Sequence, residues 1–245
     1  MWQEFLIDKT WATLLAGLSG LVAGWGLGAL SRWLPRRLEQ LWDQQRVEAG
    51  GQSQALPIVD WRTDWRVDAR SVVLALLTAL LFALCVWRLG PTPIAVCGMA
   101  LVAALLALAW IDAETGLLPD VLTLPLMWLG LLVNLHGALA PLTQAVLGAV
   151  AGYLFLWVIF HAFRLVTGRE GMGHGDFKLM AALGAWFGLA ATPTLLLGAS
   201  LAGVVVGLSL RLSGRLGRWQ ALSFGPYLAA GGILMLLAGV SLGLG

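Results

Sequence analysis

The chain has 245 residues, of which 59% are hydrophobic and 11% are charged, and its mean hydropathy is +0.84. Soluble domains carry about 25% charged residues. The composition therefore excludes a soluble globular protein and predicts one that crosses the membrane several times. The net charge is +2, and we expect no nucleic-acid partner.

Apolar runs predict about eight membrane-spanning helices, and hence an all-α, polytopic integral membrane protein. The expected bounds are 11–31, 71–89, 93–112, 121–139, 143–164, 177–191, 193–210 and 226–244. Between the first two runs lies the longest polar stretch, residues 32–70. Its mixed charges predict a short loop and not a separate domain.

Lys and Arg are unevenly distributed along the chain. If residues 32–70 face the cytoplasm, so do the connections near 113–120, 165–176 and 211–225. These four segments with their edges hold thirteen of the fifteen basic residues, Lys9 and Arg88 being the exceptions. Since cytoplasmic segments carry the excess of positive charge, we expect the N-terminus to lie outside and the polar loop to lie in the cytoplasm.

Two acidic residues stand at the ends of apolar runs. Asp112 ends the third predicted span, and Asp176 begins the sixth. Two complete crossings separate them, so both carboxylates are expected on the same, cytoplasmic face, where they can meet. Because ionisable residues at membrane depth are functional by default, we interpret them as a catalytic dyad.

Asp176 follows three glycines at alternate positions, Gly171, Gly173 and Gly175. Glycine permits unusual backbone conformations and lets another chain come close, which a peptide-binding loop requires. The sixth span is also short, at about 15 residues or roughly 22 Å against a membrane core of about 30 Å. We therefore expect this loop to dip into the membrane, and Gly184 and Gly188 to let a neighbouring helix approach.

Two carboxylates can hydrolyse a peptide bond without a metal ion and without a Ser or Cys nucleophile. One takes a proton from water while the other gives a proton to the carbonyl oxygen. Two like charges a few ångströms apart resist ionising together, so the pair shares one proton. Asp112 and Asp176 are the candidates for these roles.

Each polar residue in this region also has a simpler interpretation. Asp176 has the sequence context of a helix N-cap, whereas Asp112, at a helix C-terminus, is disfavoured by the helix dipole. Asp120 has the position of an N-cap of the fourth span, with substrate contact as the alternative. Lys178 either tunes the dyad or extends into water. Glu114 is expected to be a solvated loop residue.

The cysteines and histidines do not have the spacing of a metal site. Cys85 and Cys97 lie in apolar runs without a Cys-x-x-Cys motif, and we expect buried thiols. His174 lies in the glycine run with no second ligand nearby in the sequence. We predict no metal site.

Taken together, the motifs resemble those of the type IV prepilin peptidases, relatives of the wider group of Gly-x-Gly-Asp membrane aspartic proteases. The resemblance covers roughly residues 90 to 230 and is carried by residues 111–112, 117–126, 171–179, 183–186 and 224–227. By motif match, the two catalytic aspartates of the family fall on Asp112 and Asp176. The supporting loop then contains Gly171, Gly173, Gly175 and Lys178.

The resemblance implies a bifunctional enzyme of the bacterial inner membrane, with its active site facing the cytoplasm. The implied peptidase removes the basic leader of a type IV prepilin or a type II secretion pseudopilin after a glycine. S-adenosylmethionine then supplies a methyl group to the new N-terminal amine. The implied partners are the prepilin or pseudopilin and membrane lipid.

The N-terminal third departs from the family pattern. Within residues 24–35, the closest matches are Arg32, Leu34 and Pro35. Many members carry two Cys-x-x-Cys pairs in the following loop, whereas residues 32–70 contain no cysteine. We therefore interpret residues 1–89 as a reduced methyltransferase-like region and residues 90–245 as the peptidase region.

Two other functions compete with the peptidase. An ion-coupled transporter could use Asp112 and Asp176 to carry protons or cations, with the short sixth span as a broken helix. A non-enzymatic assembly factor could hold pilin-like helices in a groove. Such a factor would tolerate Asp112→Asn, because the change keeps the shape of the side chain and removes only its acid–base chemistry.

Overall fold

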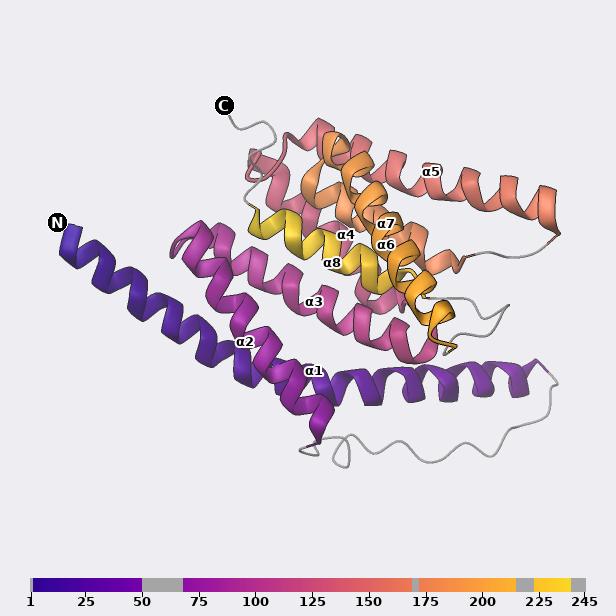
Figure 1. The fold of residues 1–245 in the computed structure, drawn as a ribbon, viewed down its shortest axis with the longest axis horizontal. Coiled ribbons are helices and arrows are strands. Elements are labelled where there is room, and N and C mark those ends of the chain that lie inside the picture. The colour runs from indigo at the N-terminus through magenta and orange to yellow at the C-terminus, as the bar shows by residue number, and fades with distance from the viewer. Residues whose placement is uncertain (1, 50–67, 169–171, 215–222, 239–245) are drawn as a thin grey trace.

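The computed structural model describes residues 2–49, 68–168, 172–214 and 223–238, with side chains from residue 8 onward. Within these ranges the chain forms eight α-helices (Figure 1). The first four are α1 Trp2–Glu48, α2 Ala69–Leu89, α3 Pro93–Thr115 and α4 Asp120–Val133. The other four are α5 Leu142–Thr167, α6 His174–Phe187, α7 Thr192–Leu212 and α8 Gly225–Leu237. Short 3-10 helices, Asn134–His136 and Leu189–Ala191, follow α4 and α6.

Five of the described helices are long and apolar enough to cross a membrane, namely α1, α2, α3, α5 and α7. The segment Asp120–His136 and α8 are apolar but shorter. The all-α, polytopic prediction is thus confirmed, while individual bounds differ. The fourth helix ends at Val133 instead of residue 139, because a 3-10 turn follows and closes at Gly137 with a φ of +70°.

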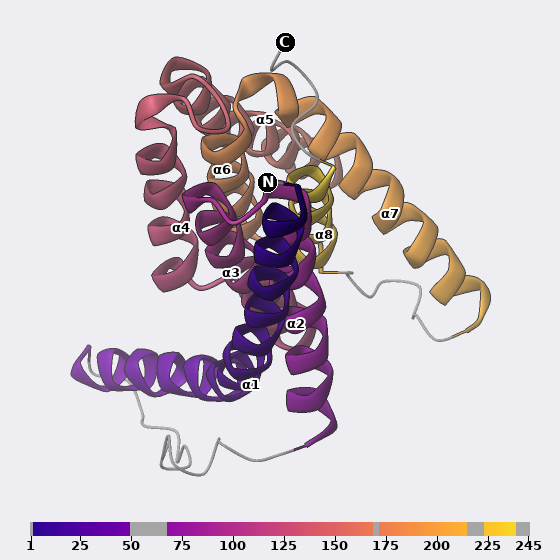
Figure 2. The same cartoon turned by 90° about the vertical axis from the view of Figure 1, so that its left-hand side faces the viewer.

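The largest difference from the sequence prediction lies in α1. This helix has 47 residues, so residues 32–48 are helical and do not belong to a loop. Residues 36–48 contain no glycine and are mostly strong helix formers, which explains why α1 continues beyond Pro35. Figure 2 shows the two parts of α1 pointing in different directions. Pro35 lies inside the helix, and a proline is a common cause of such a bend. Residues 50–67 of the expected loop lie outside the described residues.

Glycines spaced four residues apart let α1 and α2 pack backbone to backbone. A Cβ atom on Gly20 would lie 2.6 Å from the Cα atom of Ala79, and one on Gly24 would lie 2.5 Å from the Cα atom of Ala75. Gly28 continues the same row. Only glycine permits so close an approach of two membrane helices. This glycine repeat was not predicted from the sequence.

We expect Gly24→Ala to lower the free energy of unfolding by about 1–3 kcal/mol, the usual cost of overpacking. The new methyl group would meet the backbone of α2, which cannot rotate away. Gly26→Ala is the matched control, because nothing lies within 4 Å of a Cβ atom at that position. Thermal unfolding in detergent compares the two variants, and equal midpoints would contradict the close packing.

α6 lies in the middle of the C-terminal helices, against α4, α5 and α8 (Figure 1). Every residue from Asp176 to Phe187 is buried except Lys178. A helix enclosed by protein need not match the thickness of the membrane core, since its surroundings are not lipid. This explains why α6 has only 14 residues. The prediction of a short sixth helix is confirmed, although the helix ends at residue 187 and not at 191.

Glycines also bring α5 and α6 together. A Cβ atom on Gly148 would lie 2.6 Å from the carbonyl oxygen of Gly184. Gly188 ends α6 with a φ of +80°, and a Cβ atom there would lie 3.1 Å from the Cβ atom of Ala140. The expectation that Gly184 and Gly188 let a neighbouring helix approach is therefore confirmed, and that helix is α5 with the residues before it.

Buried polar side chains fix the C-terminal end of α6. The Nδ2 group of Asn134, which is fully buried, donates hydrogen bonds of 2.9 Å to the carbonyl oxygens of Ala185 and Trp186. The Oδ1 atom of Asn134 accepts two backbone N–H groups from the connection to α5. The indole of Trp186 donates to the carbonyl oxygen of Leu126 in α4, also at 2.9 Å. Carbonyl groups at a helix end lack intrahelical partners, and Asn134 supplies partners here.

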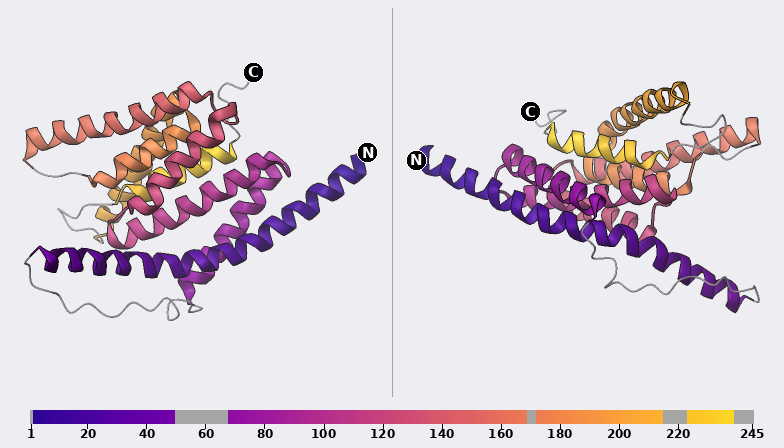
Figure 3. Two further views of the ribbon diagram at one scale, coloured as in Figure 1. Left: turned by 180° about the vertical axis from the view of Figure 1, so that it is seen from behind. Right: turned by 60° about the horizontal axis from the view of Figure 1, so that its bottom comes forward.

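α7 and α1 form opposite edges of the bundle (Figures 2 and 3). Along α7, large apolar side chains are exposed, among them Leu197, Leu201, Val204 and Leu212. In a membrane protein such a surface is suited to contact lipid chains. α1 packs on α2 and α3 on the other side.

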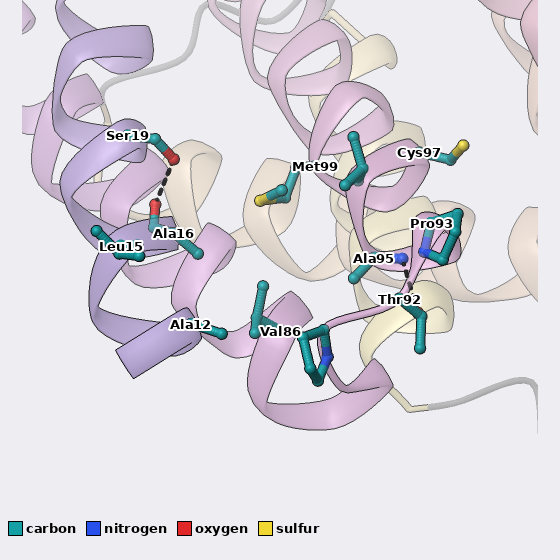
Figure 4. A pocket seen from close by; sticks show the side chains of 12 residues that line it. Ala12, Leu15, Ala16, Ser19, Val86, Thr92, Pro93, Ala95, Cys97 and Met99 are labelled. Atoms are coloured by element: carbon teal, nitrogen blue, oxygen red, sulfur yellow. Dashed lines mark hydrogen bonds between the residues drawn. The ribbon is translucent and has the colours of Figure 1, made fainter. Parts of the chain in front are cut away.

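An apolar groove of about 840 Å³ lies between α1 and the turn that joins α2 to α3 (Figure 4). Its lining includes Ala12, Ala16, Val86, Ala95 and Met99. The groove adjoins the first turn of α3, whereas Asp112 lies in the last turn of that helix. It is therefore remote from the two aspartates.

Candidate active site

Asp112 lies in the last turn of α3 and is only 5% exposed. Its Oδ2 atom accepts a hydrogen bond of 2.9 Å from the backbone N–H of Gly225, the first residue of α8. The first amides of a helix have no intrahelical partner and carry partial positive charge. The start of α8 thus stabilises a carboxylate that lies at the unfavourable end of its own helix.

Gly225 is required at this position by the space available. A Cβ atom there would lie 2.6 Å from Oδ2 of Asp112. Pro226 follows it at the start of α8, where the missing N–H group breaks no helical hydrogen bond. In the sequence, residues 224–227 stand out only as part of a motif, since no local pattern relates Gly225 to a side chain 113 positions away.

Asp176 lies in the first turn of α6 and is also 5% exposed. The N-cap of this helix is Gly173, so the N-cap interpretation of Asp176 is wrong. The carboxylate of Asp176 instead interacts with the backbone of Gly173. Its Oδ1 atom is buried and has no hydrogen-bond partner among the described residues. Such an atom is rare in a folded protein and requires an explanation.

The structure brings Asp112 and Asp176 to the same end of the bundle. α4 and α5 lie between them in the chain and run away from this end of the bundle and back to it (Figure 1). The carboxylates are close enough for the charge of Asp112 to act on Asp176. Each also lies at the N-terminal end of a helix, α8 for Asp112 and α6 for Asp176. The two carboxylates thus share one end of the bundle, and their role as a dyad stays a prediction.

The described part of the glycine run lies at the start of α6 and not in a separate loop. Gly171 lies outside the described residues, Gly173 is the N-cap, and Gly175 belongs to the first turn of α6. A Cβ atom on Gly175 would lie 2.5 Å from the Cβ atom of Leu118. Gly175 therefore lets the connection between α3 and α4 lie directly against α6. The close approach was expected, but its partner here is another part of the same chain.

Lys178 and Asp120 form an ion pair between α6 and α4. The Nζ atom lies 2.6 and 2.7 Å from the two carboxylate oxygens of Asp120. Asp120 is the first residue of α4, and the N-cap is Pro119, so the N-cap prediction for Asp120 is wrong by one position. Lys178 does not extend alone into water. Both side chains stay partly exposed, at 32% for Lys178 and 54% for Asp120.

Aromatic rings cover another side of the start of α6. Phe177 is fully buried, and its ring centroid lies 5.9 Å from that of Tyr153 and 5.5 Å from that of Phe160. The ring of His174 lies 4.9 Å from that of Phe160. These contacts pack the first turn of α6 against α5, with Phe177 buried and His174 exposed. Across the described ranges, no three His, Cys, Asp or Glu side chains are grouped so that they could hold a metal ion.

A second polar cluster lies two residues beyond Asp112. Arg70 of α2 pairs with Glu114 of α3, and the indole N–H of Trp110 donates to the same carboxylate at 2.9 Å. Glu114 is therefore a paired residue within a helix, so the expected loop is wrong, while the expected exposure to solvent is confirmed. The cluster joins α2 to the end of α3.

Asp68 is the N-cap of α2 and joins it to α1. Its Oδ1 atom accepts the backbone N–H of Ser71 at 2.9 Å, and Oδ2 lies 3.0 Å from a guanidinium nitrogen of Arg32. The hydrogen bonds from Ser71, and then the charge of Arg32, hold the pKa of Asp68 below its ordinary value. Arg32, one of the family-like positions in the N-terminal third, thus links the first two helices.

Residues 99–208 match the type IV leader peptidase family. Three similar proteins are each named prepilin leader peptidase/N-methyltransferase. The one from Dickeya chrysanthemi is 57% identical over 149 residues, which are 58% of this chain and 53% of that protein. The one from Burkholderia pseudomallei is 54% identical over 150 residues, which are 61% of this chain and 48% of that protein. The one from Neisseria gonorrhoeae is 46% identical over 157 residues, which are 64% of this chain and 54% of that protein.

The chain spans about half the length of these curated relatives. No solved structure matches it. The matched segment begins within α3, ends within α7, and includes both aspartates and the ion pair between Asp120 and Lys178. The similarity to the type IV leader peptidase family is therefore carried by residues 99–208.

Proposed function

We propose that the protein is a membrane aspartic endopeptidase that removes the basic leader of type IV prepilins or type II secretion pseudopilins after a glycine. One observation carries the proposal. Two buried aspartates, Asp112 and Asp176, come from separate helices to the same end of the bundle, within electrostatic reach of each other. The names of the similar proteins support the substrate class.

In the proposed reaction, one carboxylate takes a proton from a water molecule while the oxygen of that water attacks the scissile carbonyl carbon. The other carboxyl group gives its proton to the carbonyl oxygen, and the peptide nitrogen leaves with a proton when the intermediate collapses. Oδ1 of Asp176 is free to accept a hydrogen bond from water, whereas Oδ2 of Asp112 is held by Gly225. Helix amides offset one negative charge, and a second would be repelled by the first, so the pair is suited to hold a single proton.

The placement of the aspartates suits a substrate that is half in the membrane. A prepilin has an apolar helix that can lie in the bilayer, while its basic leader stays in the cytoplasm. We infer that the aspartate end of the bundle faces the cytoplasm of a bacterial cell, across the inner membrane, with the N-terminus outside. Basic residues near this end support the orientation: Arg32, Arg70, Arg164, Lys178 and Arg211. Arg62, Arg66, Arg169, Arg215 and Arg218 lie outside the described residues.

We further propose that the new N-terminal amine is methylated with S-adenosylmethionine. The support is the second half of the relatives' name, N-methyltransferase. The apolar groove of Figure 4 does not fit this donor, whose amino-acid part is charged, because none of the described residues that line the groove is charged. We therefore assign no residue to the methyl donor, and we divide the chain into residues 1–89, a reduced methyltransferase-like region, and residues 90–245, the peptidase region.

The test is cleavage of a prepilin with its basic leader by the purified protein in liposomes, followed by mass spectrometry. We expect the leader to be lost, and the product to gain about 14 Da when S-adenosylmethionine is added. Loss of the leader without the added mass would support the peptidase and overturn the methylation. An intact prepilin would overturn both, and the transporter hypothesis would then be tested by ion flux in the same liposomes.

A further inference from the structure

We propose that the ion pair between Lys178 and Asp120 is a positioning element, which fixes the first turn of α6 and thereby sets where the carboxylate of Asp176 lies relative to Asp112. The inference deepens the proposed peptidase function and rests on it. It assigns Lys178 and Asp120 one joint role. Lys178 then does not tune the dyad, and Asp120 does not contact the substrate.

The first turn of α6 lies against the connection that follows Asp112. This connection runs from the C-cap of α3, Gly116, to Asp120 at the start of α4. Leu118, in its middle, packs directly on Gly175, the residue before Asp176. One turn further along, both oxygens of Asp120 bind the ammonium group of Lys178. The contact and the ion pair therefore hold Asp176 to the same short segment that leaves Asp112.

Lys178 is directed away from the dyad. Successive residues of an α-helix are turned by about 100°, so side chains two positions apart lie on nearly opposite faces. Asp176 faces Asp112, whose charge acts on it, while Lys178 faces α4. The geometry thus favours a mechanical role for Lys178 and not a direct electrostatic one.

The ion pair complements a second attachment at the other end of α6. There, Asn134 binds the carbonyl oxygens of Ala185 and Trp186, and the indole of Trp186 binds α4. α6 is therefore fixed at both ends to α4 and the turn that follows it. The buried end has well-satisfied hydrogen bonds. The end that carries Asp176 depends on a partly exposed ion pair.

An exposed ion pair adds little to global stability, because water screens it. The start of a helix, however, is held by few hydrogen bonds and opens easily. Loss of the pair should therefore leave the fold intact and loosen only the first turn of α6. A displacement of about 1 Å in a catalytic group can cost about 100-fold in rate, so a partial loosening should be visible in kcat.

The test is a double-mutant cycle with Asp120→Asn, Lys178→Met and the combined variant, assayed by cleavage of a prepilin in liposomes. We expect each single variant to lower kcat about tenfold, with KM changed less than about twofold. The combined variant should be no slower than either single one, because both changes remove the same interaction. Lys178→Arg keeps the pair and should retain most of the wild-type kcat.

Two results would overturn the inference. If Lys178 acted directly on the dyad, Lys178→Met would change the pH profile of kcat while Asp120→Asn stayed active. If Asp120 contacted the substrate, Asp120→Asn would raise KM and Lys178→Met would not. Asp68→Asn is the matched control, since it removes an ion pair away from α6 while asparagine still caps α2. It should cleave like the wild type.

A second measurement does not depend on activity. Hydrogen–deuterium exchange should be faster at the amides of residues 176–178 in Asp120→Asn and Lys178→Met, and unchanged in Asp68→Asn. If the wild type cleaves no prepilin, the proposed function fails, and the exchange rates still test the attachment. If the wild type cleaves and the exchange rates of all variants agree, the positioning role fails while the peptidase function stands.

Discussion

Asparagine in place of either Asp112 or Asp176 is expected to lower kcat for leader cleavage by about 10²–10⁴-fold, the range that general acid–base catalysis supplies. The amide keeps the shape of the carboxylate but cannot exchange protons with water or with the carbonyl oxygen. KM should change little, since neither variant alters the apolar surfaces around the site. Single-turnover cleavage, followed by mass spectrometry, gives the rate directly.

The double variant, Asp112→Asn with Asp176→Asn, should be no slower than the worse single variant, because the two groups act as one unit. Asp8→Asn is the control, since Asp8 is exposed and lies near the N-terminal end of α1. It should cleave at the wild-type rate. If both single variants of the dyad also did so, the peptidase mechanism would be wrong, and the transporter or assembly hypothesis would be preferred.

Gly225→Ala should reduce kcat about 100-fold while the protein still folds. The added methyl group would meet Oδ2 of Asp112, where the distance is 2.6 Å. The carboxylate must then turn away, and it loses both the N–H group that holds it and its alignment with Asp176. The measurement is kcat for prepilin cleavage, together with the unfolding midpoint in detergent.

Gly231→Ala is the matched control on the same helix. A Cβ atom at Gly231 would lie 3.5 Å from Leu195, an ordinary contact distance. Its kcat should stay close to that of the wild type. Equal activity of Gly225→Ala and Gly231→Ala would show that α8 does not position Asp112.

The placement of both aspartates at one end of the bundle could be predicted from the sequence, because it depends only on the number of apolar segments between them. Hydropathy locates membrane crossings, and an even number of crossings between Asp112 and Asp176 puts both at the same face. The short α6 was predictable for a similar reason, since the distance between the glycine run and the proline after it is fixed by the chain. Gly184 and Gly188 could be recognised as positions of close approach from their size alone.

The partners of these residues could not be predicted. The bonds from Gly225 to Asp112, from Lys178 to Asp120 and from Asn134 to the end of α6 join segments that only the packing of the bundle brings together. Hydropathy also misjudged residues 32–48. It reports whether a segment prefers lipid, and it does not report whether a polar segment is helical, which depends on intrinsic propensity.

The enclosure of α6 has a consequence for how the protein responds to its lipid environment. Helices that face lipid tilt or shift when the bilayer becomes thicker or thinner, because their apolar length must match it. α6 is surrounded by α4, α5 and α8, and it is attached to α4 at both ends. The depth of Asp176 is therefore set by contacts within the protein, and the same geometry can be kept in membranes of different thickness.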